Sequence, residues 1–159
     1  MENEEMAQRH APVRRLTMDD LDAVVRIDRR ITNTSRREYF KAKISEAVRD
    51  SSMMVSLGAE HDGTLAGFLM GRVYYGEFGV ADTVAILDTI GVDPLLGRSG
   101  IATALLNQFV TNMKGLGVES IRTQTNWNEW GLLRFLESSG FKPAPRISLE
   151  LRFADLPVI

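Results

Sequence analysis

Hydrophobic and polar residues follow two different periods along this 159-residue chain. Apolar residues that recur every three or four positions after Thr17 and after Ser35 predict two amphipathic helices. Short apolar or alternating runs bounded by Gly, Pro, Asn or Asp predict strands. The pattern predicts strands over residues 13–16, 53–57, 65–75, 83–92, 120–125 and 146–153, and further helices over residues 101–114 and 126–139.

The predicted order of elements is β-α-α-β-β-β-α-β-α-β. Helices and strands alternate only in the second half, which favours an α/β fold with a mixed, mostly antiparallel central sheet flanked by helices. Asp62-Gly63 predicts a tight hairpin turn, because both residues tolerate positive φ angles. No repeat or linker divides the chain, so residues 12–159 are expected to form a single domain, after a flexible tail over residues 1–11.

Composition narrows the function classes. The net charge is -2 and the charges are spread along the chain, which does not favour a nucleic-acid partner. There is no cysteine, so disulfides, thiolate nucleophiles and Cys-based metal sites are excluded. No apolar run approaches the roughly 20 residues that a membrane span needs. We expect a cytoplasmic protein without a bound metal and without a membrane partner.

The sharpest local signal is the junction between the strand predicted over residues 83–92 and the following helix. Gly97-Arg98-Ser99-Gly100-Ile101-Ala102 combines small residues, a fixed positive charge and a helix start. The first N–H groups of a helix lack internal partners and carry the positive end of its dipole. This arrangement is typical of a diphosphate cradle. A tight loop before a helix explains the glycines alone equally well, whereas neither a P-loop nor a dinucleotide fingerprint is present.

The run from Val92 to Leu106, VDPLLGRSGIATALL, resembles motif A of the GCN5-related N-acetyltransferase (GNAT) superfamily, V-x-P-x-x-[Q/R]-x-x-G-[I/L]-[G/A]-x-x-L-L. The later run that ends in Gly140-Phe141 resembles its motif B. The resemblance implies a GNAT-like fold and acetyl-CoA as cosubstrate. It implies cofactor-binding roles for Ile90, Gly91, Val92, Gly97, Arg98, Ser99, Gly100, Ile101, Ala102, Thr103, Asn126, Asn128 and Phe135.

Two positions depart from the family pattern. Gly97 stands where the family usually has Gln or Arg, so Arg98 is expected to take over that phosphate contact. Leu136 aligns with the frequent Tyr that is thought to protonate the departing thiolate, and a leucine cannot donate a proton. The identity of the general acid is therefore open, with Tyr74, Tyr75 or water as candidates.

Asp88 is the candidate catalytic residue. It lies in the most apolar predicted strand, where a carboxylate is costly to bury without a partner or a task. In some relatives an acidic residue at the matching position is thought to act as base or amine anchor. A structural aspartate bonded to the backbone or to an arginine remains the alternative.

Two further groups of residues have open interpretations. Trp127 and Trp130 fit an acceptor wall, a dimer contact or ordinary packing. Arginines cluster around residues 31–35 and fit either a cationic rim of the acceptor pocket or a solvated helix face. They are Arg26, Arg29, Arg30, Arg36 and Arg37.

The resulting hypothesis is an acetyl-CoA-dependent N-acetyltransferase. The family reaction is direct attack of a primary amine, on a small molecule, peptide or protein, on the acetyl thioester. An acyl-CoA-binding module with weak or no transferase activity is the alternative, and a different acyl chain also remains open. An exposed last strand over residues 146–153 is compatible with a homodimer. The acceptor is not predictable from the sequence.

Overall fold

A five-stranded sheet in the order β1-β2-β3-β4-β5 organises the first 124 residues. The computed structural model describes residues 11–97 and 99–158, so most of the predicted tail lies outside the described residues. The strands are β1 Val13–Arg15, β2 Met54–His61, β3 Thr64–Tyr75, β4 Thr83–Val92 and β5 Ser120–Thr123. Adjacent strands are antiparallel except β4 and β5, which are parallel. The predicted mixed, mostly antiparallel sheet is confirmed.

The turn between β2 and β3 forms as its sequence predicts. Asp62 and Gly63 have φ angles of 50° and 75°. They connect His61 and Thr64, which are partners in the ladder. Two residues with positive φ match the right-handed twist of the flanking strands, and this sets the register of the hairpin.

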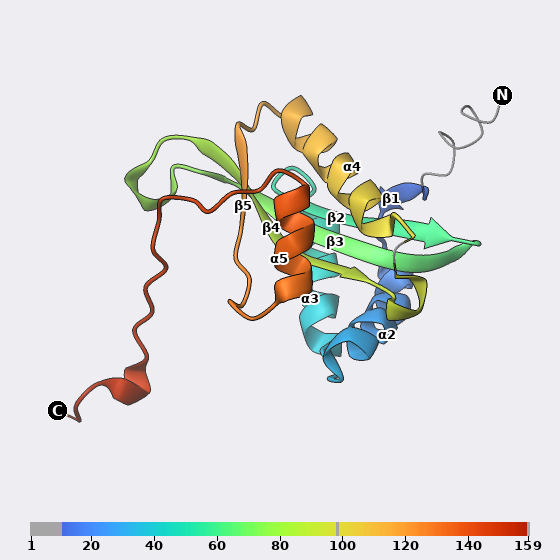
Figure 1. Cartoon of the computed structure of the whole chain (residues 1–159), viewed down its shortest axis with the longest axis horizontal. Helices are drawn as coiled ribbons and strands as arrows, with labels where there is room; N and C mark the ends of the chain where they lie inside the picture. The colour runs from blue at the N-terminus through green and yellow to red at the C-terminus, as the bar shows by residue number, and fades with distance from the viewer. Residues whose placement is uncertain (1–10, 98, 159) are drawn as a thin grey trace. The chain divides into compact units, whose positions relative to one another are not determined.

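Helices cover both faces of the sheet (Figure 1). On one face lies α4, Ile101–Gly115, whose Ile101 and Leu105 side chains contact Gly67 of β3 so closely that a Cβ there would clash. On the other face lie α2, Leu21–Thr32, and α3, Arg37–Arg49. The rings of Phe40 on α3 and Phe68 on β3 meet edge to face at 5.3 Å. Burial of such large side chains, at about 1.5–3 kcal/mol each, holds the helices on the sheet.

The residues from Thr125 onward form a second compact unit. Its helix α5 spans Trp130–Ser138, so it begins later than either predicted asparagine cap. Glu129 is the N-cap residue, and its carboxylate accepts a hydrogen bond of 3.0 Å from the backbone N–H of Asn126. This bond lies before the helix, and neither the side chain of Glu129 nor that of either asparagine accepts a hydrogen bond from the first turn of α5.

The strand predicted over residues 146–153 is not formed, and that prediction is wrong for this structure. The segment has no ladder partner and ends in a 3₁₀ turn, Phe153–Asp155. Ile147 and Leu149 are 85% and 90% exposed. A strand gains its hydrogen bonds only from a neighbouring strand. A segment whose apolar and polar residues alternate but that has no neighbouring strand therefore stays extended and solvated.

Candidate functional site

A short loop with small residues joins β4 to α4. After Val92, Asp93 caps a 3₁₀ turn, Pro94–Leu96, and its carboxylate accepts a hydrogen bond of 3.1 Å from the N–H of Leu95. Gly97, Ser99 and Gly100 follow and are exposed, whereas Arg98 lies outside the described residues. The proline and the aspartate cap end the strand, and the glycines turn the chain into the helix.

The N-terminus of α4 offers free hydrogen-bond donors. The first backbone bond at this end runs from the N–H of Ala104 to the carbonyl of Gly100, at 3.0 Å. The N–H groups of Ile101, Ala102 and Thr103 therefore have no acceptor within the helix. Gly100 has a φ angle of 79°, and no atom lies within 4 Å of the place that a Cβ would take. The open, electropositive helix end is suited to an anion such as a diphosphate.

The edge of β4 that faces β5 is open beyond Leu87. The β4–β5 ladder ends at the pair Leu87–Thr123, and Asp88 is an extra residue opposite β3, where the register shifts. The N–H of Asp93 donates to Ala66 on β3, at 2.8 Å. The backbone N–H and C=O groups of successive residues point alternately to the two edges of an antiparallel strand. Those of Ile90 and Val92 therefore point to the open edge.

The other predicted positions near this edge are placed differently. The Cα of Gly91 packs closely against α2. A Cβ at this position would lie 2.7 Å from the Phe68 ring and 3.2 Å from Ile31 of α2. By the same alternation its backbone polar groups point toward β3. Ile101 is 1% exposed, so its side chain belongs to the core under α4. Gly91 therefore brings α2 close to β4, while Ile90 and Val92 supply the free donors and acceptors.

Asp88 is held between two cations. Its carboxylate lies 3.2 Å from Nζ of Lys43 on α3 and 3.6 Å from Nε of Arg72 on β3. Its side chain is 27% exposed, so the group is neither fully solvated nor sealed in the core. The guanidinium of Arg72 also donates to the hydroxyl of Tyr74, at 3.1 Å. Lys43 and Arg72 balance the charge of this carboxylate, whose partial exposure leaves it in contact with solvent.

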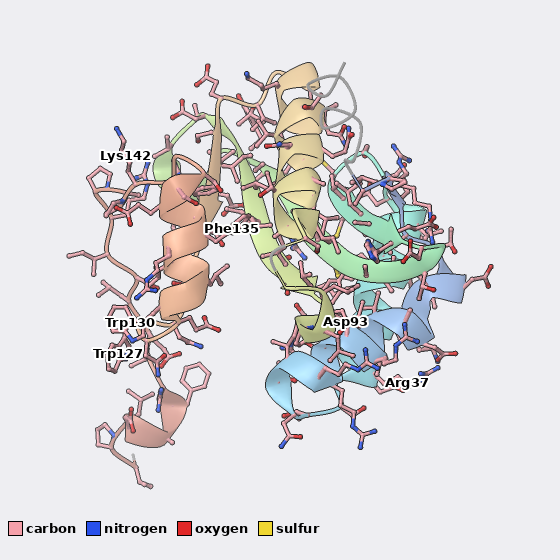
Figure 2. All side chains as sticks on the ribbon, turned by 45° about the vertical axis from the view of Figure 1, so that its right-hand side comes forward. Arg37, Asp93, Trp127, Trp130, Phe135 and Lys142 are labelled. Carbon is pink, nitrogen blue, oxygen red and sulfur yellow. The ribbon has the colours of Figure 1, made fainter. Side chains whose placement is uncertain are left out.

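An ion pair ties α2 to the end of β4. Nη1 of Arg30 lies 2.5 Å from Oδ2 of Asp93, whose side chain is 10% exposed. Figure 2 shows Asp93 where β4 ends, above the ribbon of α2. The partners in this pair, and Lys43 and Arg72 beside Asp88, could not be named from the sequence, because each contact depends on strand register and helix placement.

Three predicted cofactor residues, Asn126, Asn128 and Phe135, belong to the second unit. Both asparagines are exposed and Phe135 is partly buried. Trp127 and Trp130 meet edge to face at 6.5 Å and are 80% and 61% exposed (Figure 2). Ordinary core packing therefore does not explain the two tryptophans.

The described part of the chain also lacks two features. No three His, Asp or Glu side chains in residues 11–97 and 99–158 are grouped to hold a metal ion. None of the described helices is long and apolar enough to cross a membrane.

Solved structures share this fold. A transcriptional regulator from Bacillus halodurans C-125 aligns with a TM-score of 0.76 at 19% identity, over 91% of this chain and all of that one. An aminoglycoside N-acetyltransferase in complex with CoA aligns with a TM-score of 0.76 at 17% identity, over 91% and 95% of the two chains. A ribosomal-protein-alanine N-acetyltransferase from Brucella melitensis biovar Abortus 2308 gives 0.72 at 17% identity, over 89% and 99%.

No curated protein matches the sequence. The family model described as the acetyltransferase (GNAT) family matches residues 21–141, which include β4, the cradle and α4. The match spans most of the chain and agrees with the structural alignments and with motifs A and B. The chain belongs to the acetyltransferase (GNAT) family.

Proposed function

We propose that the chain transfers the acetyl group of acetyl-CoA to a primary amine by direct attack. One observation carries the proposal: the open N-terminus of α4 follows directly on the strand edge at which Ile90 and Val92 have free polar groups. A diphosphate fits the helix end, and an amide-bearing chain fits the strand edge. Relatives solved in complex with CoA, the aminoglycoside N-acetyltransferase and a PaiA N-acetyltransferase from Thermoplasma acidophilum, support this proposal.

The chain's residues have distinct tasks in this proposal. The N–H groups of Ala102 and Thr103, with Gly100 leaving room, bind the diphosphate. The polar groups of Ile90 and Val92 bind the pantetheine amides and supply a donor to the carbonyl oxygen as it gains charge. Asn126, Asn128 and Phe135 remain proposed cofactor contacts on the resemblance alone.

Acetyl-CoA supplies a thioester whose carbonyl carbon forms the new C–N bond as the C–S bond breaks and the sulfur leaves as thiolate. We assign Asp88 to hold the incoming ammonium and to take its proton, directly or through water, before attack. The ion pairs with Lys43 and Arg72 orient this carboxylate. Leu136 donates no proton, and a thiol's pKa near 8.5 lets the sulfur leave as thiolate. The second proton of the attacking nitrogen passes to this thiolate or to water as the amide forms.

A CoA-binding module with weak or no transferase activity is the second candidate. The two cations on Asp88 favour it, because they occupy the carboxylate that an amine needs. Leu136 at the acid position favours it as well. Turnover separates the two candidates: a binding module binds acetyl-CoA and releases no CoA when amines are added.

The first experiment, which tests the cofactor site that both candidates share, is calorimetric titration with acetyl-CoA of the wild type, Thr103→Asp and the control Thr111→Asp. Thr103 is exposed in the first turn of α4, where an added carboxylate suits the helix dipole but repels a diphosphate. Thr111 is exposed on the same helix, far from that end. We expect micromolar binding that only Thr103→Asp weakens, by about tenfold or more. Absence of binding to the folded wild type would overturn the proposal.

Organisation and location complete the proposal. The family model extends across the boundary between the two units, which supports one domain over residues 12–159. We place the protein in the cytoplasm, where acetyl-CoA is available. The acceptor, whether small molecule, peptide or protein, and the length of the acyl chain are to be determined by turnover assays.

We further propose a homodimer in which residues 146–153 of one copy pair with the β5 edge of the other. In the sheet, β5 has a partner on one side only. The segment carries alternating apolar side chains that are all exposed, namely Ile147, Leu149, Leu151 and Phe153. Pro143 and Pro145 stiffen the arm before it, which favours exchange with a second copy over a tight return.

A further inference from the structure

The carboxylate that we assign as the base already holds an amine of this chain. Nζ of Lys43 on α3 donates a hydrogen bond of 3.2 Å to Oδ2 of Asp88. The sequence contains four lysines, and the other three, Lys41, Lys114 and Lys142, are exposed. The side chain of Lys43 is 20% exposed. The least exposed lysine of the chain therefore lies on the carboxylate to which the proposed function brings an acceptor ammonium.

The contacts of Arg72 indicate that Lys43 does more than pair with Asp88. Nε of Arg72 lies 3.6 Å from the same Oδ2, which is too far for a hydrogen bond. This Nε is buried and has no hydrogen-bond partner among the residues that the structure describes. A guanidinium and a carboxylate commonly form two parallel hydrogen bonds. Lys43 thus holds the oxygen nearest to Nε of Arg72 and leaves that buried donor unsatisfied, which a purely structural ion pair does not explain.

The amine of Lys43 lies where the open edge of β4 begins. The β4–β5 ladder ends at the pair Leu87–Thr123, and Asp88 follows directly. The free polar groups of Ile90, to which the proposed function brings the thioester end of acetyl-CoA, lie two residues further, about 7 Å along the strand. The side chain of a lysine is a flexible four-carbon stem. Its nitrogen can therefore leave the carboxylate and approach the open edge while α3 stays packed on the sheet.

We propose that Lys43 is an acetylation site that this chain modifies itself: with acetyl-CoA bound and no other amine at Asp88, the acetyl group passes to Nζ of Lys43. The inference rests on the proposed function, because it uses the same carboxylate and the same thioester. It goes beyond that function because the accepting amine belongs to the protein. The fold fixes this amine beside the base, so the step does not require binding of an amine from solution.

The step balances with the groups at the site and acetyl-CoA. Asp88 takes one proton from the ammonium, directly or through water, and leaves a neutral amine. The nitrogen lone pair forms a bond to the thioester carbonyl carbon, and the C–S bond breaks with its electron pair on sulfur. A second proton of the nitrogen passes to this thiolate or to water. The products are CoA and a neutral acetamide on Lys43.

Acetylation changes the charge beside the base. The acetylated side chain keeps one N–H donor and has no positive charge, so Lys43 no longer forms an ion pair with Asp88. Oδ2 is then free to accept from the buried Nε of Arg72. Residues two positions apart on a helix do not share a face, so Lys41 does not reach this carboxylate. The modification is therefore expected to stop at one acetyl group per chain.

The test is incubation of the 159-residue chain with isotope-labelled acetyl-CoA and no added amine, followed by intact-mass measurement and peptide fragmentation. The label separates new acetyl groups from any that are already present. We expect one labelled group, at Lys43, formed about tenfold faster or more than at the other lysines, Lys41, Lys114 and Lys142. Acetic anhydride is the chemical reference, because its reaction follows exposure. It is expected to label the three exposed lysines before Lys43.

Paired variants connect the label to the site. Asp88→Asn cannot take the proton, so labelling of Lys43 is expected to slow by about tenfold or more. The control Asp82→Asn, at an exposed position before β4, is expected to be labelled as the wild type is. Lys43→Arg is expected to lose the label without gaining another site, and Lys41→Arg is expected to keep it. The rate per chain is expected to be independent of protein concentration, because the transfer takes place within one chain.

The outcomes separate the inference from the function on which it rests. If acetyl-CoA binds and a panel of primary amines is acetylated while Lys43 stays unlabelled, the inference is wrong and the proposed function stands. The inference is also overturned by labelling in the order found with acetic anhydride, by equal labelling of the wild type and Asp88→Asn, or by a rate that rises with protein concentration. If acetyl-CoA does not bind, the proposed function and the inference both fail. Selective, Asp88-dependent labelling of Lys43 supports both.

Discussion

Arg30 and Asp93 are 63 positions apart in the sequence, yet their side chains form an ion pair of 2.5 Å that joins the end of α2 to the end of β4. Asp93 is also the cap of the following turn. One carboxylate thus fixes both the turn that follows β4 and the end of α2. Because Asp93 is 7% exposed, loss of its partner leaves a buried charge with fewer hydrogen bonds.

A double-mutant cycle measures this relationship. Arg30→Gln, Asp93→Asn and the double variant are expected to show a coupling free energy of about 0.5–2 kcal/mol in urea unfolding. The control cycle is Arg37→Gln with Asp22→Asn, an ion pair whose side chains are 51% and 82% exposed. Solvent screens that pair, so its coupling is expected below about 0.5 kcal/mol. Equal coupling in the two cycles would contradict the structural role of Asp93.

Gly91 is predicted to be required for packing between β4 and α2. In Gly91→Ala the new methyl group lies 2.7 Å from the Phe68 ring, so the free energy of unfolding should fall by about 1–3 kcal/mol. Phe68→Leu in the same chain should recover part of this loss relative to the two single changes. The control is Gly115→Ala at the end of α4, where no atom lies within 4 Å of the new methyl group. That change is expected to be neutral or stabilising, and equal effects at both positions would refute the packing argument.

Local patterns predicted much of this fold because they act over a few residues. Asp62-Gly63 specifies its hairpin, and the small residues before Ile101 specify the cradle, since each depends on backbone conformations that few residues adopt. The mixed, mostly antiparallel sheet and the order of its elements as far as α5 follow from helix and strand periods together with the family resemblance.

Other features depend on distant partners and were not predictable. The alternation of apolar and polar residues over residues 146–153 shows that the segment suits a sheet. This pattern does not determine which strand pairs with the segment. The apolar setting of Asp88 singled it out as a candidate, whereas its two cationic neighbours could not be named from the sequence, because they come from α3 and β3. The arginine cluster was visible in sequence, but only the structure separates the paired Arg30, Arg36 and Arg37 from Arg26 and Arg29.

Asp88→Asn tests the proposed base. The amide keeps the size of the side chain and cannot take a proton from the amine, so the single-turnover rate at saturating acetyl-CoA should fall by about 10²–10⁴-fold. Acetyl-CoA affinity is expected to be unchanged, because the free polar groups of Ile90 and Val92 remain. Asp82→Asn, at an exposed position before β4, is the matched control and should retain the wild-type rate. An unchanged rate in Asp88→Asn would exclude Asp88 as the base.

The Arg14–Asp20 pair predicts how stability depends on pH. The guanidinium of Arg14 lowers the pKa of the Asp20 carboxyl, against the opposing effect of burial and with help from the N–H of Thr17. A carboxyl whose pKa is lower in the folded state stabilises the fold above its unfolded pKa of about 3.9. That stabilisation is lost as the pH falls through the folded-state pKa.

Asp20→Asn should therefore lower the free energy of unfolding by about 1–3 kcal/mol at pH 7. The difference from the wild type should shrink as the pH falls below about 4, where the wild-type carboxyl also becomes neutral. Asp19→Asn changes an exposed neighbour and should have little effect at either pH. A difference between wild type and Asp20→Asn that stays constant from pH 7 to pH 2.5, roughly the acid limit of this transition, would contradict the ion pair.

The proposed exchange of residues 146–153 predicts a dimer that depends on one face of this segment. In a strand, alternate side chains point to opposite faces, so Leu149 and Ser148 report on different sides. Leu149 is 90% exposed in the single chain, and its burial against a second copy should stabilise the dimer by about 1.5–3 kcal/mol. Leu149→Lys should therefore raise the dimer dissociation constant by about tenfold to a hundredfold in light scattering coupled to gel filtration.

Ser148→Lys adds the same charge on the opposite face and should leave the dimer in place. A monomeric wild type at micromolar concentration, or equal weakening by both changes, would exclude the exchange, whereas selective weakening by Leu149→Lys would show that the apolar face meets the partner.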